Sequence, residues 1–309
     1  MAIVKKQKHV FGSTERVLFN TVKEAYDDPL IRAGLLTLFK EQINAVENEN
    51  YRGIDLARED LADTIYNYPK VIFEDTIQLE RGVIASAFRE VGQVRLPFPK
   101  MTVISSSNFS NNKITAITPW YLVQDQDSVI AYFVTNRLDS TVVDTCAFRY
   151  YLSEFGEKGS NQMLTEIMLS PEHIKIVGEE RVKTLAGLLM HVVTRVIYMM
   201  TISGGDFYIS TPNPKEAASN AKRVRKNKKP LIEFRMITID GKKPDTLKSL
   251  PQGTHASPRL HWRRGHYRTI SSGKKVWIDP MLVGDEKNGK IIKDYAVGNY
   301  EEQRNVAVL

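Results

Sequence analysis

The sequence lacks most of what disulfide-rich, membrane-bound and zinc-binding proteins need. Cys146 is the single cysteine in 309 residues, which excludes a disulfide framework within the chain and any cysteine-rich zinc site. No stretch reaches the roughly 18 uninterrupted apolar residues of a membrane span. The basic residues at 1–9 are not followed by an apolar run, so we expect no signal peptide. These absences predict a cytoplasmic protein with no membrane partner.

Acidic residues are scarce in one part of the chain. The formal net charge is +7, from 43 Lys and Arg against 36 Asp and Glu. Residues 222–275, however, contain sixteen basic and three acidic residues, so this segment carries +13 and the remainder −6. Lys and Arg bind phosphates by releasing counterions from the polyanion. The distribution predicts RNA or another polyanion as a partner, although a solvated basic linker, or contact with the chain's own acidic part, is the competing interpretation.

The periodicity of apolar residues predicts an α+β fold. With 42% hydrophobic residues the chain can bury a core. A helical period predicts helices at residues 21–46 (with a break near Asp28-Pro29), 55–66, 74–91 and 178–202. Short β-type runs predict strands at residues 101–105, 117–123, 129–134 and 142–152, with a polar loop at 105–113. The acids Asp55, Glu59, Asp60 and Asp63 fall near one helical face, which favours a solvated face over a metal site.

Proline and basic residues divide the chain near residue 211. Thr211-Pro-Asn-Pro214 is followed by a basic run that ends at Pro230. We therefore predict a helical and β N-terminal body at 1–210 that selects the target, a basic connector at 211–230, and a small antiparallel β-module at 231–309. Four strand-like runs predict the sheet of this module, at residues 231–239, 261–270, 274–282 and 290–297.

The segment His261-Trp-Arg-Arg-Gly-His266 and its continuation predict a β-hairpin. If Ser272-Gly273 is a two-residue turn, Arg268 lies opposite Trp277 and His266 opposite Asp279. Because side chains alternate across a strand, one face then combines cations with two indole rings. This predicted face consists of Trp262, Arg264, His266, Arg268, Lys275, Trp277 and Asp279.

Three interpretations of this predicted face remain open. The first is a surface that binds RNA or single strands, in which the Trp rings stack on bases. The second is a metal-independent ribonuclease, in which Asp279 orients His266 as a general acid or base and an arginine stabilises the phosphorane. The third is structural, with stacked Arg and Trp side chains and a His–Asp pair that stabilise an exposed sheet.

The first interpretation defines the predicted nucleic-acid site. Its residues are Trp262, Arg263, Arg264, His266, Arg268, Lys275 and Trp277, together with the basic run Lys222, Arg223, Arg225, Lys226, Lys228 and Lys229. His266 and Asp279 are the catalytic candidates if the protein is an enzyme. No metal or cofactor is expected, because His261 and His266 are five residues apart and so lie on opposite faces of a strand.

Several of these motifs resemble a known family. They are residues 230–239, Pro258-Arg-Leu-His-Trp-Arg-Arg-Gly-His-Tyr-Arg268, Gly273-Lys-Lys-Val-Trp-Ile278, Val283-Gly-Asp285 and Lys293-Asp-Tyr-Ala-Val297, with a weaker match at Leu96-Pro-Phe-Pro99. The segments resemble a group of bacteriophage and mobile-element proteins that includes, more distantly, the type V-A anti-CRISPR inhibitor of Cas effector biogenesis. The resemblance implies recognition of the nascent N-terminal peptide of a target and loss of the message under translation.

Together, charge and resemblance predict a phage-encoded, RNA-binding regulatory or inhibitor protein in the host cytoplasm. It would lower the expression of a host or defence protein, with RNA and that protein or its nascent peptide as partners. A protein-binding inhibitor with no nucleic-acid contact is the alternative, in which the basic third of the chain neutralises an acidic partner.

Overall fold

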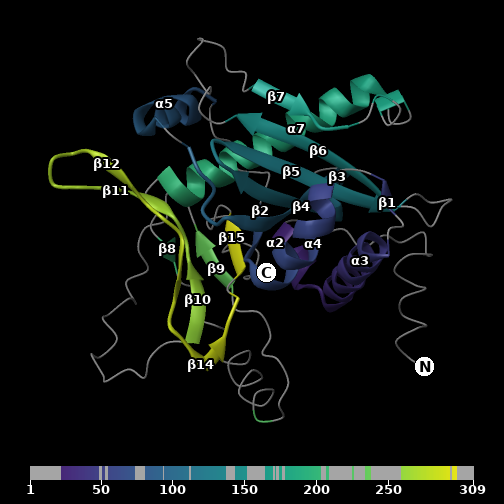
Figure 1. Cartoon of the computed structure of the whole chain (residues 1–309), viewed down its shortest axis with the longest axis horizontal. Coiled ribbons are helices and arrows are strands. Elements are labelled where there is room, and N and C mark those ends of the chain that lie inside the picture. The colour runs from purple at the N-terminus through teal and green to yellow at the C-terminus, as the bar shows by residue number, and fades with distance from the viewer. Residues whose placement is uncertain are drawn as a thin grey trace, which may run out of the picture.

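A large mixed sheet forms the centre of the molecule (Figure 1). The computed structural model describes residues 22–48, 51–52, 55–73, 81–92, 94–110, 113–136, 143–151, 164–169, 171, 174–175, 178–202, 207–208, 225, 234–237, 259–292 and 294–297. The strands in spatial order are β1 (Tyr51–Arg52), β6 (Val143–Tyr151), β5 (Ser128–Asn136), β4 (Lys113–Asp125), β3 (Lys100–Ser110), β2 (Lys70–Phe73), β15 (Asp294–Val297), β9 (Phe234–Ile237) and β8 (Phe207–Tyr208). Strand β7 (Leu164–Ile167) also pairs with β6. Strands β3 to β6 form an antiparallel meander, whereas β2 is parallel to both β3 and β15.

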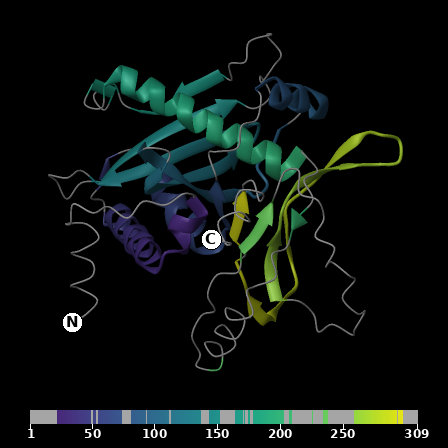
Figure 2. The same cartoon turned by 180° about the vertical axis from the view of Figure 1, so that it is seen from behind.

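Apolar side chains cover both faces of this sheet with the two-residue period of a strand. In β5, Ile130 and Tyr132 point to one face, and Val129 and Ala131 to the other. Helices α2 (Val22–Asp27), α3 (Pro29–Glu47) and α4 (Asp55–Asn67) cover the first face. The second face is covered by α5 (Arg81–Val91), α7 (Glu179–Ile197) and the π-helical turn η2 (Tyr198–Ile202), which are seen from behind in Figure 2. The α+β prediction is confirmed.

The predicted break at Asp28-Pro29 is the start of α3. Asp28 has extended backbone angles, and its Oδ1 accepts the N–H groups of Leu30 at 2.8 Å and Ile31 at 3.1 Å. An aspartate N-cap satisfies helix donors that have no partner in the helix, and Pro29 needs none. The same two residues that interrupt the apolar period therefore begin a helix.

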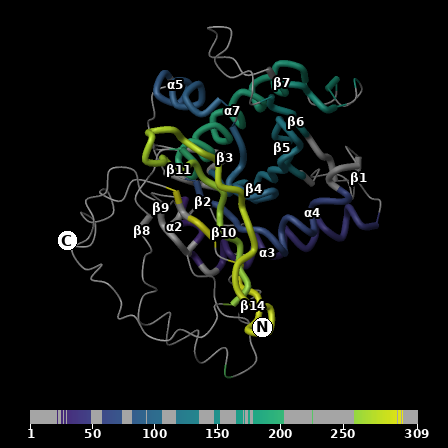
Figure 3. Tube along the Cα trace, turned by 60° about the vertical axis from the view of Figure 1, so that its left-hand side comes forward, coloured from purple at the N-terminus to yellow at the C-terminus, as the bar shows by residue number. Residues whose placement is uncertain are grey.

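The C-terminal part of the chain contributes to two kinds of sheet. Strands β10 (Arg259–Arg263), β13 (Met281–Val283) and β14 (Asp285–Lys290) form a three-stranded sheet, and β11 (His266–Thr269) pairs with β12 (Lys275–Ile278) in an antiparallel hairpin. These strands form the long arm that runs from β14 to β11 in Figure 3. Strands β9 and β15 instead pair in parallel within the large sheet, which contains elements on both sides of residues 211–230. The division of the chain into domains stays a prediction.

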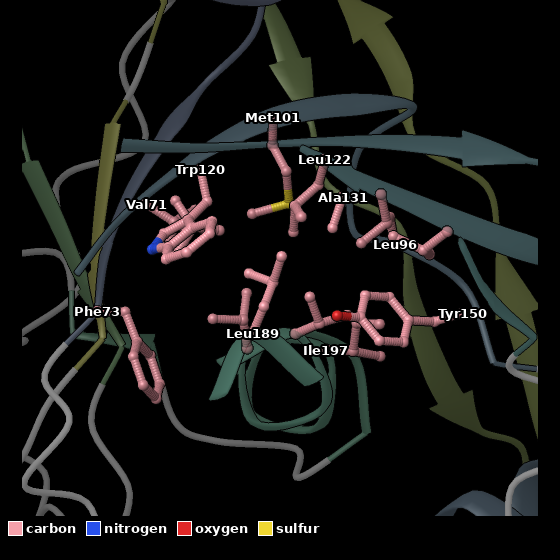
Figure 4. Close-up of a cluster of buried hydrophobic side chains, with 14 of the residues drawn as sticks. Val71, Phe73, Leu96, Met101, Trp120, Leu122, Ala131, Tyr150, Leu189 and Ile197 are labelled. Atoms are coloured by element: carbon pink, nitrogen blue, oxygen red, sulfur yellow. The ribbon is translucent and has the colours of Figure 1, made fainter. Parts of the chain in front are cut away.

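Helix α7 is the main apolar helix of the core. In Figure 4, Met101, Trp120 and Leu122 from the sheet point toward Leu189 and Ile197 of α7. Residues 179–202 are long and apolar enough to cross a membrane, and they are the single candidate span in the part of the chain that the structure describes. More than half of the most apolar window, 56%, is buried inside the fold. This is the pattern of a core helix.

Two local predictions are corrected by the structure. The polar segment predicted as a loop at 105–113 extends β3 to Ser110 and starts β4 at Lys113, because the hairpin ladder continues into polar residues. In α4, Asp60 and Asp63 bind the ammonium of Lys100, the latter at 2.7 Å. The predicted solvated acidic face is therefore in part an ion-pair network against β3.

Candidate functional site

A two-stranded β-ribbon carries most of the residues predicted to bind nucleic acid. We call residues 259–283 the ribbon; its first strand is β10 and β11, and its second strand is β12 and β13. His261 pairs with Val283 and His266 with Ile278, so both halves keep one register across the break between them. The β11–β12 end projects from the body in Figures 1 and 2.

The tip of the ribbon is a three-residue loop, where we predicted a two-residue turn. The N–H of Ile270 donates to the carbonyl of Lys274 at 2.9 Å, and the N–H of Gly273 donates to the carbonyl of Ile270 at 2.9 Å. Gly273 has a φ of +80°, a left-handed conformation that glycine adopts readily and that closes three-residue hairpin loops. The predicted register is therefore wrong by one residue.

This shift turns the second strand of the ribbon over, because successive side chains point to opposite faces. Arg268 pairs with Val276, and Tyr267 pairs with Trp277. Trp277 therefore shares a face with Tyr267, and the predicted combination of Arg268 and Trp277 on one face does not form.

His266 and Asp279 lie on opposite faces for the same reason, so the predicted orienting pair is wrong. The Nδ1 atom of His266 lies 3.4 Å from the carbonyl oxygen of Arg264. Burial lowers the pKa of His266, and the positive charges of Arg264 and two further arginines lower it more, against the opposing effect of this hydrogen bond. The imidazole is therefore mostly neutral at pH 7.

The indole of Trp277 packs on the backbone of Gly265, where a side chain would not fit. A Cβ added at Gly265 would lie 2.5 Å from Cζ2 and 2.7 Å from Cη2 of Trp277, and 2.9 Å from Cδ of Pro280. The Trp277 Nε1–H donates to Asp279 Oδ1 at 2.7 Å, and the ring centroid lies 5.0 Å from that of Tyr267. Trp277 is thus part of the packing within the ribbon.

The indole of Trp262 packs against the body at the C-terminal end of α4. Its ring stacks on Tyr68, with centroids 5.1 Å apart and planes 23° from parallel. Its Nε1–H donates to the carbonyl of Asn67 at 3.1 Å, while Lys290 Nζ donates to Asn67 Oδ1 at 2.9 Å. The Lys100 ammonium lies 5.9 Å from the Tyr68 ring centroid. The base of the ribbon is therefore anchored by aromatic stacking and hydrogen bonds.

The Arg264-Gly265 break joins the ribbon to the segment that precedes β3. The Gly265 N–H donates to the carbonyl of Pro97 at 2.7 Å. This bond connects two of the sequence segments that carry the resemblance, at 96–99 and 258–268. Arg264 is half-buried, and burial lowers its pKa to about 9, against the raising effect of Tyr295. The guanidinium stays charged at pH 7 and lies where the ribbon meets the core.

The Trp277 face of the ribbon is also held by two ion pairs. Lys275 Nζ lies 2.8 Å from Glu90 Oε2 on α5, and Arg95 Nη1 lies 3.6 Å from Asp279 Oδ1. Lys275, one of the predicted nucleic-acid ligands, thus has an acidic partner within the chain.

The opposite face of β11–β12, which we call the outer face, is basic and open to solvent. Arg268 is exposed on it, and so is Lys274 at the tip. Val276 and Ile270 add exposed apolar surface, at 38% and 41% exposure. Lys274 was not among the predicted ligands, although its position beside the predicted turn was a usable signal.

The structure brings together only part of the predicted nucleic-acid site. Arg225 of the basic run is exposed; Lys222, Arg223, Lys226, Lys228 and Lys229 lie outside the described residues. Within the described residues there is no cluster of His, Cys, Asp and Glu that could hold a metal ion. The partners of the Trp262 ring, Tyr68 and Asn67, come from a distant part of the chain and left no local signal.

The comparisons with known proteins identify the family. Residues 91–285 match the AcrVA2-like family, described as the anti-CRISPR type V subtype A2 family. The match spans more than half of the chain, including α7 and the ribbon, so the chain belongs to this family. No curated protein and no solved structure matches it. The resemblance predicted from the sequence is confirmed. Membership of this family identifies the protein as a phage inhibitor whose target is a host defence protein.

Proposed function

We propose that this protein lowers the expression of a type V-A CRISPR effector, or of another host defence protein, and that it contacts RNA while doing so. The family match over residues 91–285 is the observation that carries the inhibitory role. In this proposal the body recognises the nascent N-terminal peptide of the target inside the host cell, and the basic segment at 222–275 binds the message or associated RNA.

The charge distribution supports the RNA contact. The segment carries +13, and Arg225, Arg263, Arg268 and Lys274 are exposed in it. Exposed cations near phosphates contribute affinity that falls steeply with salt, because counterions are released on binding. The exposed apolar residues Ile270 and Val276 favour the alternative, a protein-binding inhibitor that does not touch nucleic acid.

An expression assay tests the proposal in cells. The protein is induced in a strain that carries a type V-A effector, and effector protein and effector mRNA are measured by immunoblot and quantitative PCR. We expect the amounts of effector protein and effector mRNA both to fall. An effector whose N-terminal codons have been replaced is the control, and its protein and mRNA should stay constant. If interference is lost while effector protein and mRNA stay constant, the protein acts by binding the finished effector, and the alternative is correct.

RNA binding is tested separately with purified protein. We expect a shift of labelled RNA at 50 mM salt, and an affinity that falls by at least about tenfold at 200 mM salt. Arg263→Ala with Arg268→Ala should weaken binding. Arg181→Ala with Lys40→Ala, which removes two exposed cations from helices α7 and α3, is the matched control. Protein that elutes without nucleic acid and shows no RNA shift at low salt would contradict the RNA contact.

A further inference from the structure

We infer that the outer face of the ribbon docks on double-helical RNA rather than on unpaired bases. The inference rests on the RNA contact of the proposed function and states which form of RNA the ribbon fits. Three features of the described residues carry it: where the aromatic rings are, where the charges are, and what the tip presents.

The aromatic rings of the ribbon are occupied by the protein itself. Trp262 stacks on Tyr68, and Trp277 lies between Gly265 and Tyr267. Proteins that bind unpaired strands stack successive bases on exposed rings. The outer face presents none of the ribbon's Trp or Tyr rings among the residues that the structure describes. Its one imidazole, that of His266, is half-buried and lies 3.4 Å from the Arg264 carbonyl oxygen. The affinity of this face for RNA must therefore come mainly from the phosphate backbone.

The charges of the outer face suit a phosphate backbone. Residues 263–278 contain no Asp or Glu. The nearest acidic side chain in sequence, Asp279, lies on the opposite face and pairs with Arg95. Arg268 is exposed along the ribbon, and Lys274 is exposed at its tip. A face with cations and no carboxylates binds the closely spaced phosphates of a duplex, which has a higher linear charge density than a single strand.

The tip adds hydroxyl groups to these cations. Ser271 and Ser272 are exposed in the loop beside Lys274. The wide, shallow minor groove of A-form RNA displays 2′-hydroxyls, and duplex RNA is recognised there by 2′-hydroxyl and phosphate contacts. Ile270 is five residues beyond Gly265 in the sequence, so the hairpin extends about 17 Å beyond the break. It is therefore long and narrow enough to follow a groove, with Ile270 against the riboses.

Fluorescence anisotropy with the full chain tests this inference. The probes are a 20-base-pair RNA hairpin, an unstructured RNA of equal charge, and a DNA hairpin of the same sequence. We expect the RNA hairpin to bind at least about tenfold more tightly than the unstructured RNA. Arg268→Ala with Lys274→Ala should weaken hairpin binding about tenfold and reduce the slope of log affinity against log salt by about 2.

Two further variants sharpen the test. Ser271→Ala with Ser272→Ala should reduce the preference for RNA over DNA without changing the salt slope, because hydroxyls carry no charge. Arg181→Ala with Lys183→Ala, on the exposed side of α7, should change nothing.

The outcomes separate this inference from the proposed function. Equal or tighter binding of unstructured RNA overturns the inference and leaves the RNA contact intact. Failure to bind any RNA removes both. If Arg268→Ala with Lys274→Ala binds the hairpin normally but no longer captures the defence protein, the outer face is a protein interface and the inference is wrong.

Discussion

Replacement of Gly265 by alanine is the most direct test of how the ribbon is built. The new Cβ would lie within 3 Å of Trp277 and Pro280. Neither neighbour moves easily, because Pro280 is a ring on the backbone and the Trp277 indole donates a 2.7 Å hydrogen bond to Asp279. We therefore expect Gly265→Ala to force Trp277 out of its site.

Gly265→Ala should lower the free energy of unfolding, because Gly265 is buried and the added methyl group overpacks its site. An added methyl group in a tight site destabilises by about 1–3 kcal/mol, and we expect about 2 kcal/mol here. For a chain of 309 residues this corresponds to a decrease in Tm of about 3 °C. The matched control is Gly187→Ala in α7, where an added Cβ meets nothing within 4 Å. Because alanine is the better helix former, it should stabilise by up to about 1 kcal/mol.

Thermal and urea unfolding followed by circular dichroism measure these differences. The decisive measurement is the double variant with Trp277→Phe, which removes the two indole atoms nearest the added Cβ. We expect Gly265→Ala to cost less in that background, with a coupling of about 1 kcal/mol. If Gly265→Ala is neutral, or costs the same with and without Trp277, the packing described for the ribbon is not what requires glycine.

Two other predictions concern charges in the body. Lys100→Met should lower the free energy of unfolding by about 2 kcal/mol, because it leaves Asp60 and Asp63 together without their ammonium partner. Burial raises the pKa of Asp63, but hydrogen bonds from Lys100 and a neighbouring amide bring it below its usual 3.8. The stability due to this pair is therefore present above about pH 4 and lost as the pH falls through the lowered pKa of Asp63. Urea titrations of the two proteins should then converge in strong acid. Asp294 is buried, and its Oδ1 accepts the Lys70 N–H at 2.9 Å; burial raises its pKa despite the nearby positive charge. A raised carboxyl pKa favours the folded state in acid and opposes it as the pH rises. Asp294→Asn keeps the hydrogen-bond acceptor but cannot ionise. Its Tm should therefore rise relative to that of the wild type between pH 4 and pH 8. If the two Tm curves run parallel over this range, the pKa of Asp294 is not raised.

Residues close together in sequence explain the parts of the fold that could be predicted. The apolar period predicted α4, and α7 together with η2, to within about one residue, and Asp28-Pro29 marked the start of α3. Strand β2 was missed, because four residues between two helices are too few to show a period. It pairs in parallel with β3 on one side and, on the other, with β15, more than two hundred residues later.

In the candidate site, prediction from the sequence fails by a single residue in the length of the hairpin loop. The sequence of the hairpin was sufficient to predict two strands and a turn that contains Gly273. It was not sufficient to choose between a two-residue and a three-residue loop, and that choice decides whether Trp277 lies beside Arg268 or beside Tyr267. Because the side-chain period of a strand is two, an error of one residue exchanges the faces of the whole second strand.

The sequence by itself determined the fold class, the division of charge between a +13 segment and an acidic remainder, and the resemblance to an anti-CRISPR family. These properties depend on composition and local pattern, which do not require a folded chain. Only the tertiary structure decided that Trp262 packs against Tyr68 and Trp277 against Gly265. It also decided that the outer face of the ribbon carries Arg268 and Lys274. Contacts between residues far apart in sequence form only when the whole core is in place, and so no local period encodes them.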